Sequence, residues 1–311
     1  MTAIGAISSD IDTLQSIYRG RGRRRAEYTY AELRMGLETF SRFLDRYRIK
    51  ATLFMVGSDF LQPQNHSAIR FVSSEGHEIA NHTHTHAQGF RLLDAQAQEQ
   101  ELARMEEACI EVTGRRPIGF RSPGWNMSDG ALPILKRRGY LYDSSIHPMS
   151  ATPALKALHW LSTSRCDAIE RTTLGQWSYM FAPLRPYHTD ATRLRRRGTG
   201  GIVELPLSVV PIVRAPFWAT FLLAAGYGVF RACYLMLRAA RLPVHYMFHL
   251  SDFVDYSHPD LADQVPVSGG VYVPQALTMP LDRKLALFER AMDLMAADCQ
   301  FVTLEQWART V

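Results

Sequence analysis

Short apolar runs rich in β-forming residues alternate with longer segments of helical period along almost the whole chain. Between the runs, apolar residues recur at spacings of three and four, as in Leu33, Leu37 and Phe40, which is the pattern of a helix with one buried face. This alternation predicts an α/β protein with a parallel sheet, most simply a distorted (β/α) barrel of seven to eight parallel strands. The strand-like runs lie at 3–8, 51–57, 77–81, 117–120, 140–143, 202–207, 244–249 and 300–304.

We expect the 311 residues to form a single domain, because no internal repeat and no long linker interrupts the alternation. Two stretches depart from it. Residues 150–200 read as an irregular insertion, and residues 215–241 read as an apolar helix with a basic edge. The uncharged part, 215–230, falls short of the roughly 20 residues that a spanning helix needs. A core helix of the barrel and a helix lying on a membrane surface both fit, and core packing is slightly favoured.

Arginine is concentrated in two clusters, five residues within 19–25 and four within 193–197, in a chain of formal net charge +5. Neither cluster has interleaved aromatic residues or a nucleic-acid motif, so we do not expect nucleic-acid binding. Guanidinium groups suit phosphate groups and anionic membrane surfaces, because the planar fork pairs with two phosphate oxygens at once.

The cysteines and the first residues indicate the compartment. Four cysteines are widely spaced without a CxxC pair, which argues against a disulfide framework or a thiolate zinc site. The opening "MTAIGAISSD" lacks the basic start and apolar run of a secretion signal. We therefore expect a cytoplasmic protein. Peripheral contact with the inner face of the plasma membrane is compatible with that location.

Polar residues gather where the predicted strands end. They occur in "SSDID" (8–12), "NHTHTH" (81–86), "FRSPGW" (120–125), "YDSS" (142–145) and "FHLSD" (248–252). The carboxyl ends of parallel strands meet at one edge of a barrel, where the active sites of such folds lie. The sequence therefore predicts an active site built from these five motifs.

The histidines of the second motif suggest a metal. On an extended strand His82, His84 and His86 would share one face, whereas in a helical turn only His82 and His86 would. Spacing alone leaves both arrangements open. Catalytic zinc sites commonly combine three His or carboxylate ligands with an open water position, so three histidines near the aspartates of "SSDID" favour such a site.

The five motifs, in this order, resemble those of the NodB-type polysaccharide deacetylases, carbohydrate esterase family 4. The spacing Asp10-Ile11-Asp12 is similar to the form seen in the lipid-linked arabinose deformylases and some intracellular deacetylases, where other members have adjacent aspartates. The resemblance implies one divalent metal held by Asp12, His82 and His86, with His84 in a variable position. These ligands suit zinc first and also accept cobalt, nickel or iron.

The resemblance also implies the catalytic roles. Asp10 would be the general base, His249 the general acid and Arg121 the partner that keeps Asp10 ionised. Asp143 would orient the acid histidine. Trp125 would form a wall for the sugar ring or pack in the core, and Ser122 would contact the sugar. His147, His188 and His258 are expected to be surface or structural histidines.

The implied reaction is hydrolysis of the N-acetyl or N-formyl amide of an amino sugar. With no export signal, a polyprenyl-phosphate-linked precursor of the cell envelope at the cytoplasmic membrane face is the favoured substrate. Arg21, Arg23 and Arg24 would then bind its phosphate. The alternatives are a hydrolase of a small soluble amide, cyclic ureide or nucleotide-linked amino sugar, and an inactive sugar-binding scaffold.

Overall fold

The computed structural model describes residues 3–20, 30–152, 175–261 and 275–311. Its centre is one nine-stranded sheet in the order β6-β7-β5-β4-β3-β2-β1-β8, and β9 also pairs with β1. All pairings are parallel except β6 with β7. The strands are β1 (Ala3–Ile11), β2 (Thr52–Met55), β3 (Glu78–Asn81), β4 (Gly119–Phe120), β5 (Tyr142–Asp143), β6 (Tyr187–Asp190), β7 (Gly200–Glu204), β8 (Val244–His249) and β9 (Cys299–Phe301).

The parallel strands confirm the predicted α/β architecture, since eight strands lie at the eight predicted runs. The sheet is curled but open, because β6 and β8 remain its edges within the described residues. Strand β6 was not predicted. It pairs antiparallel with β7 from inside the stretch expected to be irregular, so that expectation is wrong for this part of the stretch. Residues 153–174 of that stretch lie outside the described residues.

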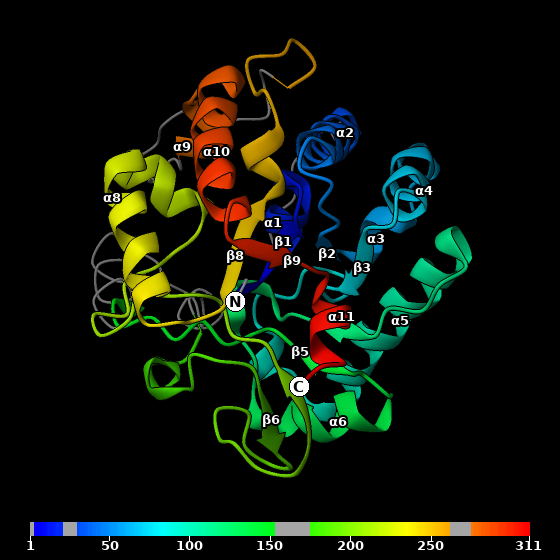
Figure 1. The fold of residues 1–311 in the computed structure, drawn as a ribbon. Coiled ribbons are helices and arrows are strands. Elements are labelled where there is room, and N and C mark those ends of the chain that lie inside the picture. The colour runs from blue at the N-terminus through cyan, green and yellow to red at the C-terminus, as the bar shows by residue number, and fades with distance from the viewer. Residues whose placement is uncertain (1–2, 21–29, 153–174, 262–274) are drawn as a thin grey trace, which may run out of the picture.

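Helices cover the sheet in two groups. Figure 1 shows α2, α4 and α5 in succession on one side, and α8 beside α10 on the other. The α-helices are α1 (Leu14–Gly20), α2 (Ala31–Asp45), α3 (Gly57–Phe60), α4 (His66–Ser74), α5 (Ala95–Thr113), α6 (Leu132–Arg137), α8 (Ala219–Ala239), α9 (Gln275–Thr278), α10 (Leu281–Ala296) and α11 (Leu304–Ala308). Short 3-10 turns are η1 (Pro63–Asn65), η2 (Phe90–Leu92), η3 (Pro123–Trp125), η4 (Asp129–Ala131), η6 (Trp177–Phe181) and η7 (Leu250–Phe253).

The main core fixes the position of the strand ends. The predicted stripe of α2 is fully buried, and its Phe40 packs edge-on against Phe253, just beyond β8. Phe248 of β8 packs against both Phe253 and Phe288 of α10. Each fully buried leucine or phenylalanine contributes roughly 1.5–3 kcal/mol to folding. These rings therefore hold the carboxyl end of β8 firmly against the helices.

Helix α8 has one buried face, as a core helix does, and one exposed apolar face, as a helix on a membrane surface would have. Within the described residues it is the one helix long and apolar enough to cross a membrane. However, it is interrupted at Gly226, where φ is 79°. Phe230, Tyr234 and Leu237 are buried in the core, which satisfies the core-packing expectation. The other face is exposed and apolar, with Val229, Leu235 and Met236 between 41% and 47% accessible.

Candidate active site

The two outermost catalytic candidates lie side by side on neighbouring strands. Asp10 of β1 and His249 of β8 are register partners in a parallel pair. Both are at the carboxyl ends of their strands, so the backbone ladder holds their Cα atoms at the spacing of adjacent strands, about 4.8 Å. The sheet thus brings together residues that are far apart in the sequence, as the motif positions predicted.

Arg121 is the centre of a buried hydrogen-bond network that includes Asp10. Its side chain is wholly buried, and Nη1 donates to Asp10 Oδ1 at 2.5 Å. The rest of the guanidinium is also engaged: Nε donates to the Ser144 carbonyl, and Nη2 donates to the hydroxyls of Ser8 and Ser144. His245 Nε2 lies 3.3 Å from Nη2. A guanidinium fixed from this many sides cannot rotate away from the Asp10 carboxylate.

The electrostatics keep Asp10 ionised although it is buried. Burial alone would raise the pKa of Asp10, but the Arg121 guanidinium, helped by His82 and His249, outweighs it and leaves the pKa below its ordinary value. Asp12 differs, because burial raises its pKa to about 6, with His249 lowering and Asp10 raising it. Asp12 is therefore the carboxylate that a nearby cation would stabilise most.

The histidine motif is neither a strand nor a helical turn. Strand β3 ends at Asn81, and Thr83 and His86 have left-handed backbones with φ of 63° and 57°. This turn brings the rings of His82 and His86 to 5.2 Å centroid separation. His84 instead faces Gly57, where a Cβ atom would lie 2.7 Å from His84 Nδ1. The geometry groups the outer two histidines and separates the middle one.

Asp12, His82 and His86 offer the donor set of a divalent-metal site. His86 Nε2 lies 3.6 Å from Asp12 Oδ2. His82 Nδ1 donates a hydrogen bond to the Arg121 carbonyl at 2.8 Å. Its Nε2 is thereby left unprotonated and able to ligate a metal, as in metal-ligating histidines. As placed, no three His, Cys, Asp or Glu side chains in the described ranges form a complete metal-holding group. The three side chains fit a divalent metal by the chemistry of their donor atoms and by the orientation of the His82 ring.

His249 is oriented by Asp252. The His249 backbone N–H donates to Asp252 Oδ2 at 2.8 Å, and a ring nitrogen of His249 accepts the Asp252 backbone N–H. The other ring nitrogen is left to carry a proton. The expectation that Asp143 performs this role is not met. Its carboxylate accepts hydrogen bonds from the hydroxyl and backbone N–H of Ser145.

Asp143 belongs to a buried carboxyl pair with Glu204, its register partner on β7. Burial raises the pKa of both groups, and the charge of Asp143 adds to the rise at Glu204. Two wholly buried carboxyl groups in contact are expected to share a proton. The pair joins β5 to β7, and the charge of Arg121 offsets part of the rise in both pKa values.

An aromatic wall stands beside His249. The rings of Trp125 and Trp218 stack at 4.9 Å, and the His147 ring lies 4.6 Å from that of Trp218. Trp218 also meets His249 edge-on at 6.3 Å. His147 is only 4% exposed, so of the two expected possibilities, surface or structural, it is structural; neither of its ring nitrogens has a hydrogen-bond partner among the described residues.

A cavity of about 350 Å³ is lined by the two tryptophans of this wall and by Asp12. Trp125 lines it, as predicted. Ser122 does not, since it is wholly buried and its backbone N–H donates to Ser145 Oγ. Arg21, Arg23 and Arg24 lie outside the described residues. The lining residues are Asp12, Leu14, Ile17, Gln88, Trp125, Trp218, Thr220, His249, Ser251, Tyr256, Ala276 and Leu277.

Comparison with known proteins supports the motif-based expectation. Residues 34–142 match the family model for polysaccharide deacetylase. The matched stretch, which runs from α2 to β5, is therefore similar to the NodB-type polysaccharide deacetylases. A peptidoglycan deacetylase-like protein from Gibberella zeae is 34% identical over 116 residues, which cover 36% of this chain and 33% of that protein. A peptidoglycan-N-acetylglucosamine deacetylase from Bacillus cereus is 32% identical over 97 residues, or 31% of this chain and 44% of the relative.

The similarity in structure extends further than the similarity in sequence. A solved protein from Mycobacterium smegmatis, assigned to the polysaccharide deacetylases, covers all of this chain with 90% of its own length at a TM-score of 0.60 and 21% identity. At that identity the match establishes the NodB fold. The chain is matched to these curated relatives over less than half of their length.

Three residues of the site were missed by sequence reasoning. Asp252 carried a signal, because it follows His249 by three positions in a capping-box arrangement. Trp218 was the tryptophan directly before the apolar helix, and only the fold shows that it stacks on Trp125. His245 lies on β8 with its ring against Ser8, and nothing in its local sequence marks it as a support for Arg121.

Proposed function

We propose that this protein is a metal-dependent hydrolase that removes the N-acetyl or N-formyl group of an amino sugar. The observation that supports it most directly is the pairing of Asp10 and His249 across β1 and β8, beside the cavity that His249 lines. One is a carboxylate held ionised by Arg121, and the other is a histidine held by Asp252. Amide hydrolysis needs such a base and acid on two sides of one carbon–nitrogen bond.

Asp12, His82 and His86 would hold a divalent cation, with zinc first among the candidates. When bound there, the cation would lower the pKa of a water ligand towards ~7 and polarise the amide carbonyl. Asp12 carries the carboxylate with the pKa raised to about 6, which is the group that gains most from a neighbouring positive charge. The Nδ1 bond of His82 to the Arg121 carbonyl keeps its Nε2 directed for ligation.

The residues of the chain divide the proton transfers between them. Asp10 accepts a proton from the attacking water, because Arg121 keeps it ionised and its position fixed. His249 donates a proton to the leaving amine, since an amine leaves readily only after protonation. The Asp252 backbone N–H occupies one ring nitrogen of His249, so the proton moves from the other nitrogen.

The cavity suits a single sugar unit with an apolar face against Trp125 and Trp218. A carrier of the polyprenyl-phosphate type is supported by the exposed apolar face of α8, where Val229, Leu235 and Met236 face outward. This carrier, with a cytoplasmic location at the inner membrane face, is the finer part of the proposal. Arg21, Arg23 and Arg24 would bind its phosphate.

The proposal is tested by incubating the purified, zinc-loaded protein with a lipid-linked N-acetylhexosamine and with its nucleotide-linked counterpart. We expect a loss of acetyl mass from the lipid-linked compound, and no loss with Asp10→Asn. Turnover of only the soluble compound would remove the lipid carrier from the proposal. No turnover of either compound, nor of their N-formyl analogues, by protein that binds the metal stoichiometrically would contradict the hydrolase itself.

A further inference from the structure

The described surface carries an exposed apolar cluster beside the candidate active site. Its members come from η6 and from the segment that leads into α8. Ile212 is 93% exposed, and Trp177 and Phe181 are 63% and 62% exposed, with Val213 at 56%. Soluble proteins expose single apolar residues routinely, but a group of large ones marks an interaction site. We name Trp177, Phe181, Ile212 and Val213 the apolar rim.

Hydrogen bonds join the two halves of the apolar rim. Arg214 Nη1 donates to the carbonyl of Ala182, the residue after Phe181, at 2.9 Å. Trp177 and Phe181 meet edge-on at 6.3 Å. The carbonyls of Val213 and Arg214 are bound by the Ser150 side chain and backbone. The rim is therefore one built surface, although its members lie more than 30 positions apart in the sequence.

Ile212 is held out to solvent at the tip of a narrow loop. Val209 pairs antiparallel with Pro216, and Val210 N–H donates to Ala215. At the tip Ile212 and Arg214 have φ of 69° and 49°. A β-branched residue in the left-handed region is strained. Glycine or asparagine would relieve that strain, so an exposed isoleucine there indicates a use for its apolar side chain.

The apolar rim is attached directly to the aromatic wall of the cavity. Gly175 N–H donates to the Gly124 carbonyl, and Tyr179 OH donates to the Met127 carbonyl at 2.8 Å, on the two sides of Trp125. On the other half, the loop of Ile212 runs into Trp218, which stacks on Trp125. Both tryptophans line the cavity. Whatever the rim contacts is thereby held next to the mouth of the cavity.

The charge around the apolar rim suits an anionic surface. Neither 175–189 nor 205–251 contains an aspartate or a glutamate. Arg214 lies in the loop of the apolar rim itself, directly after Val213, and its guanidinium donates to the Ala182 carbonyl. Exposed tryptophan and phenylalanine, on segments that carry arginine and lack acidic residues, are features of proteins that insert at the headgroup level of a bilayer.

We propose that the apolar rim docks this protein on an anionic lipid bilayer and holds the cavity at the membrane surface. The inference deepens the proposed function and rests on it for its purpose, because a sugar on a lipid phosphate would be presented at that surface. The docking itself depends only on Trp177, Phe181, Ile212, Val213 and the surrounding charge.

The test measures co-sedimentation of the full chain with vesicles of phosphatidylcholine, with or without one quarter phosphatidylglycerol. We expect binding to the anionic vesicles, and at least tenfold weaker partitioning for the variant carrying Trp177→Ser, Phe181→Ser and Ile212→Asn. Asn is used at 212 because it tolerates the left-handed backbone. The control carries Leu61→Ser and Ile110→Ser, which remove apolar side chains 56% and 44% exposed on α3–η1 and α5, and should bind like the unaltered protein. Thermal melting confirms that both variants fold.

Three outcomes would overturn the docking surface. In the first, the rim variant binds vesicles as well as the unaltered protein does. In the second, Val229→Ser with Leu235→Ser on α8 abolishes binding while the rim variant retains it. In the third, the rim mediates self-association by light scattering, without vesicle binding. Vesicle binding through the rim by a protein that hydrolyses none of the sugar amides would leave the docking surface standing and end the proposed function, so the two failures are distinguishable.

Discussion

The two ends of β3 use the same residue type for opposite purposes. His77 precedes the strand, and both of its ring nitrogens have partners, Ala51 N–H and Ser41 Oγ. His82 and His86 follow the strand, where their rings lie 5.2 Å apart and His86 Nε2 lies 3.6 Å from Asp12 Oδ2. At the amino end the chain closes the core, whereas at the carboxyl end it opens into loops around a cavity. The position along the strand therefore decides whether a histidine is structural or available for chemistry.

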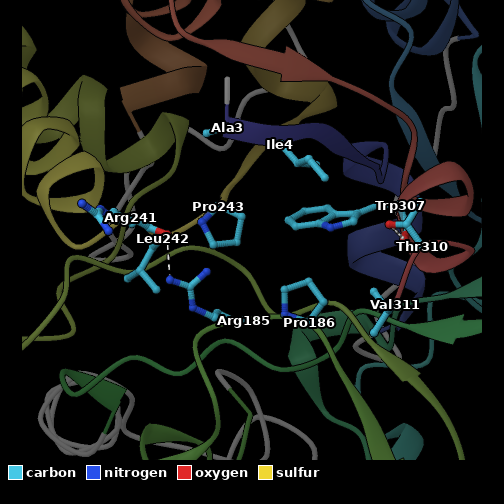
Figure 2. Close-up of a pocket in the computed structure, with 10 residues that line it drawn as sticks. All are labelled: Ala3, Ile4, Arg185, Pro186, Arg241, Leu242, Pro243, Trp307, Thr310 and Val311. Carbon is cyan, nitrogen blue, oxygen red and sulfur yellow. Dashed lines mark hydrogen bonds between the residues drawn. The ribbon is translucent and has the colours of Figure 1, made fainter. Parts of the chain in front are cut away.

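The cavities at the two ends differ in the same way. The larger one, about 430 Å³, lies at the amino ends of β1 and β8, and Figure 2 shows Ile4, Pro186, Pro243 and Trp307 around it. The guanidinium of Arg185 is tied to the Arg241 carbonyl at 2.7 Å. None of its described lining residues is a histidine, aspartate or glutamate. The smaller cavity has Asp12 and His249, so side-chain chemistry and not volume identifies the active site.

The largest expected effect of a substitution is at the carboxyl end. Asp10→Asn should lower kcat by about 10³-fold, because the base is lost, and should retain the bound metal. His86→Ala should lose both turnover and metal. Turnover assays with elemental analysis of the purified variants measure both quantities. If Asp10→Asn strips the metal, the roles of Asp10 and Asp12 are reversed.

Next comes the buried ion pair behind the base. Arg121→Met should lower the free energy of unfolding by about 3–5 kcal/mol, because Asp10 would keep a buried charge with no cation beside it. The acid side of the pH–activity profile should also move to higher pH, since the pKa of Asp10 rises without Arg121. Urea denaturation and rate measurements test the two parts. Arg238→Met, which breaks the more exposed pair with Asp298, is the control and should cost less than about 1 kcal/mol.

His77, at the amino end of β3, should affect the free energy of unfolding and its dependence on pH. Burial lowers the pKa of His77 to about 4 from 6.5, so the unfolded chain binds the proton first as the pH falls. The free energy of unfolding should therefore decrease between pH 6.5 and about 4, by about 3 kcal/mol from this group. Denaturation across that range, with His77→Gln as the matched variant, isolates the contribution. Identical pH dependence of the two proteins would show that His77 does not titrate in this way.

The smallest effect is expected at the larger cavity. Arg241→Ala removes an exposed side chain. The hydrogen bond from Arg185 is kept, because it is made to the backbone carbonyl of residue 241. Activity should stay within about twofold, and the free energy of unfolding within about 0.5 kcal/mol. Trp218→Ala in the smaller cavity should instead raise KM by about tenfold through loss of ring stacking. A similar rise in KM for both variants would remove the distinction between the two cavities.

The sequence predicted the features that depend on local patterns. Eight strands followed from apolar runs bounded by polar residues, and the convergence of Asp10 and His249 followed from their places at strand ends. Strand β6 escaped prediction because Tyr187–Asp190 is short and partly polar and gains its stability from pairing with β7. Its turn to β7 includes the arginines of 193–197, which read as an isolated loop.

Features set by strand register and long-range contact could not be predicted. Asp143 lies at a strand end, as expected, but the register of β5 on β7 places it beside Glu204. Arg121 owes its orientation to Ser8, Ser144 and His245, residues from three other parts of the chain. His147 joins the aromatic wall only because the fold brings Trp218 to it.

The register of Asp10 with His249 has a consequence for how such an enzyme can diversify. The Cα separation of Asp10 and His249, the proposed proton acceptor and donor, is set by the ladder between β1 and β8. Segments that shape the cavity, such as the one carrying Trp218, can be exchanged without disturbing that separation. An engineer seeking a new sugar specificity would therefore graft loops and leave these two strands untouched.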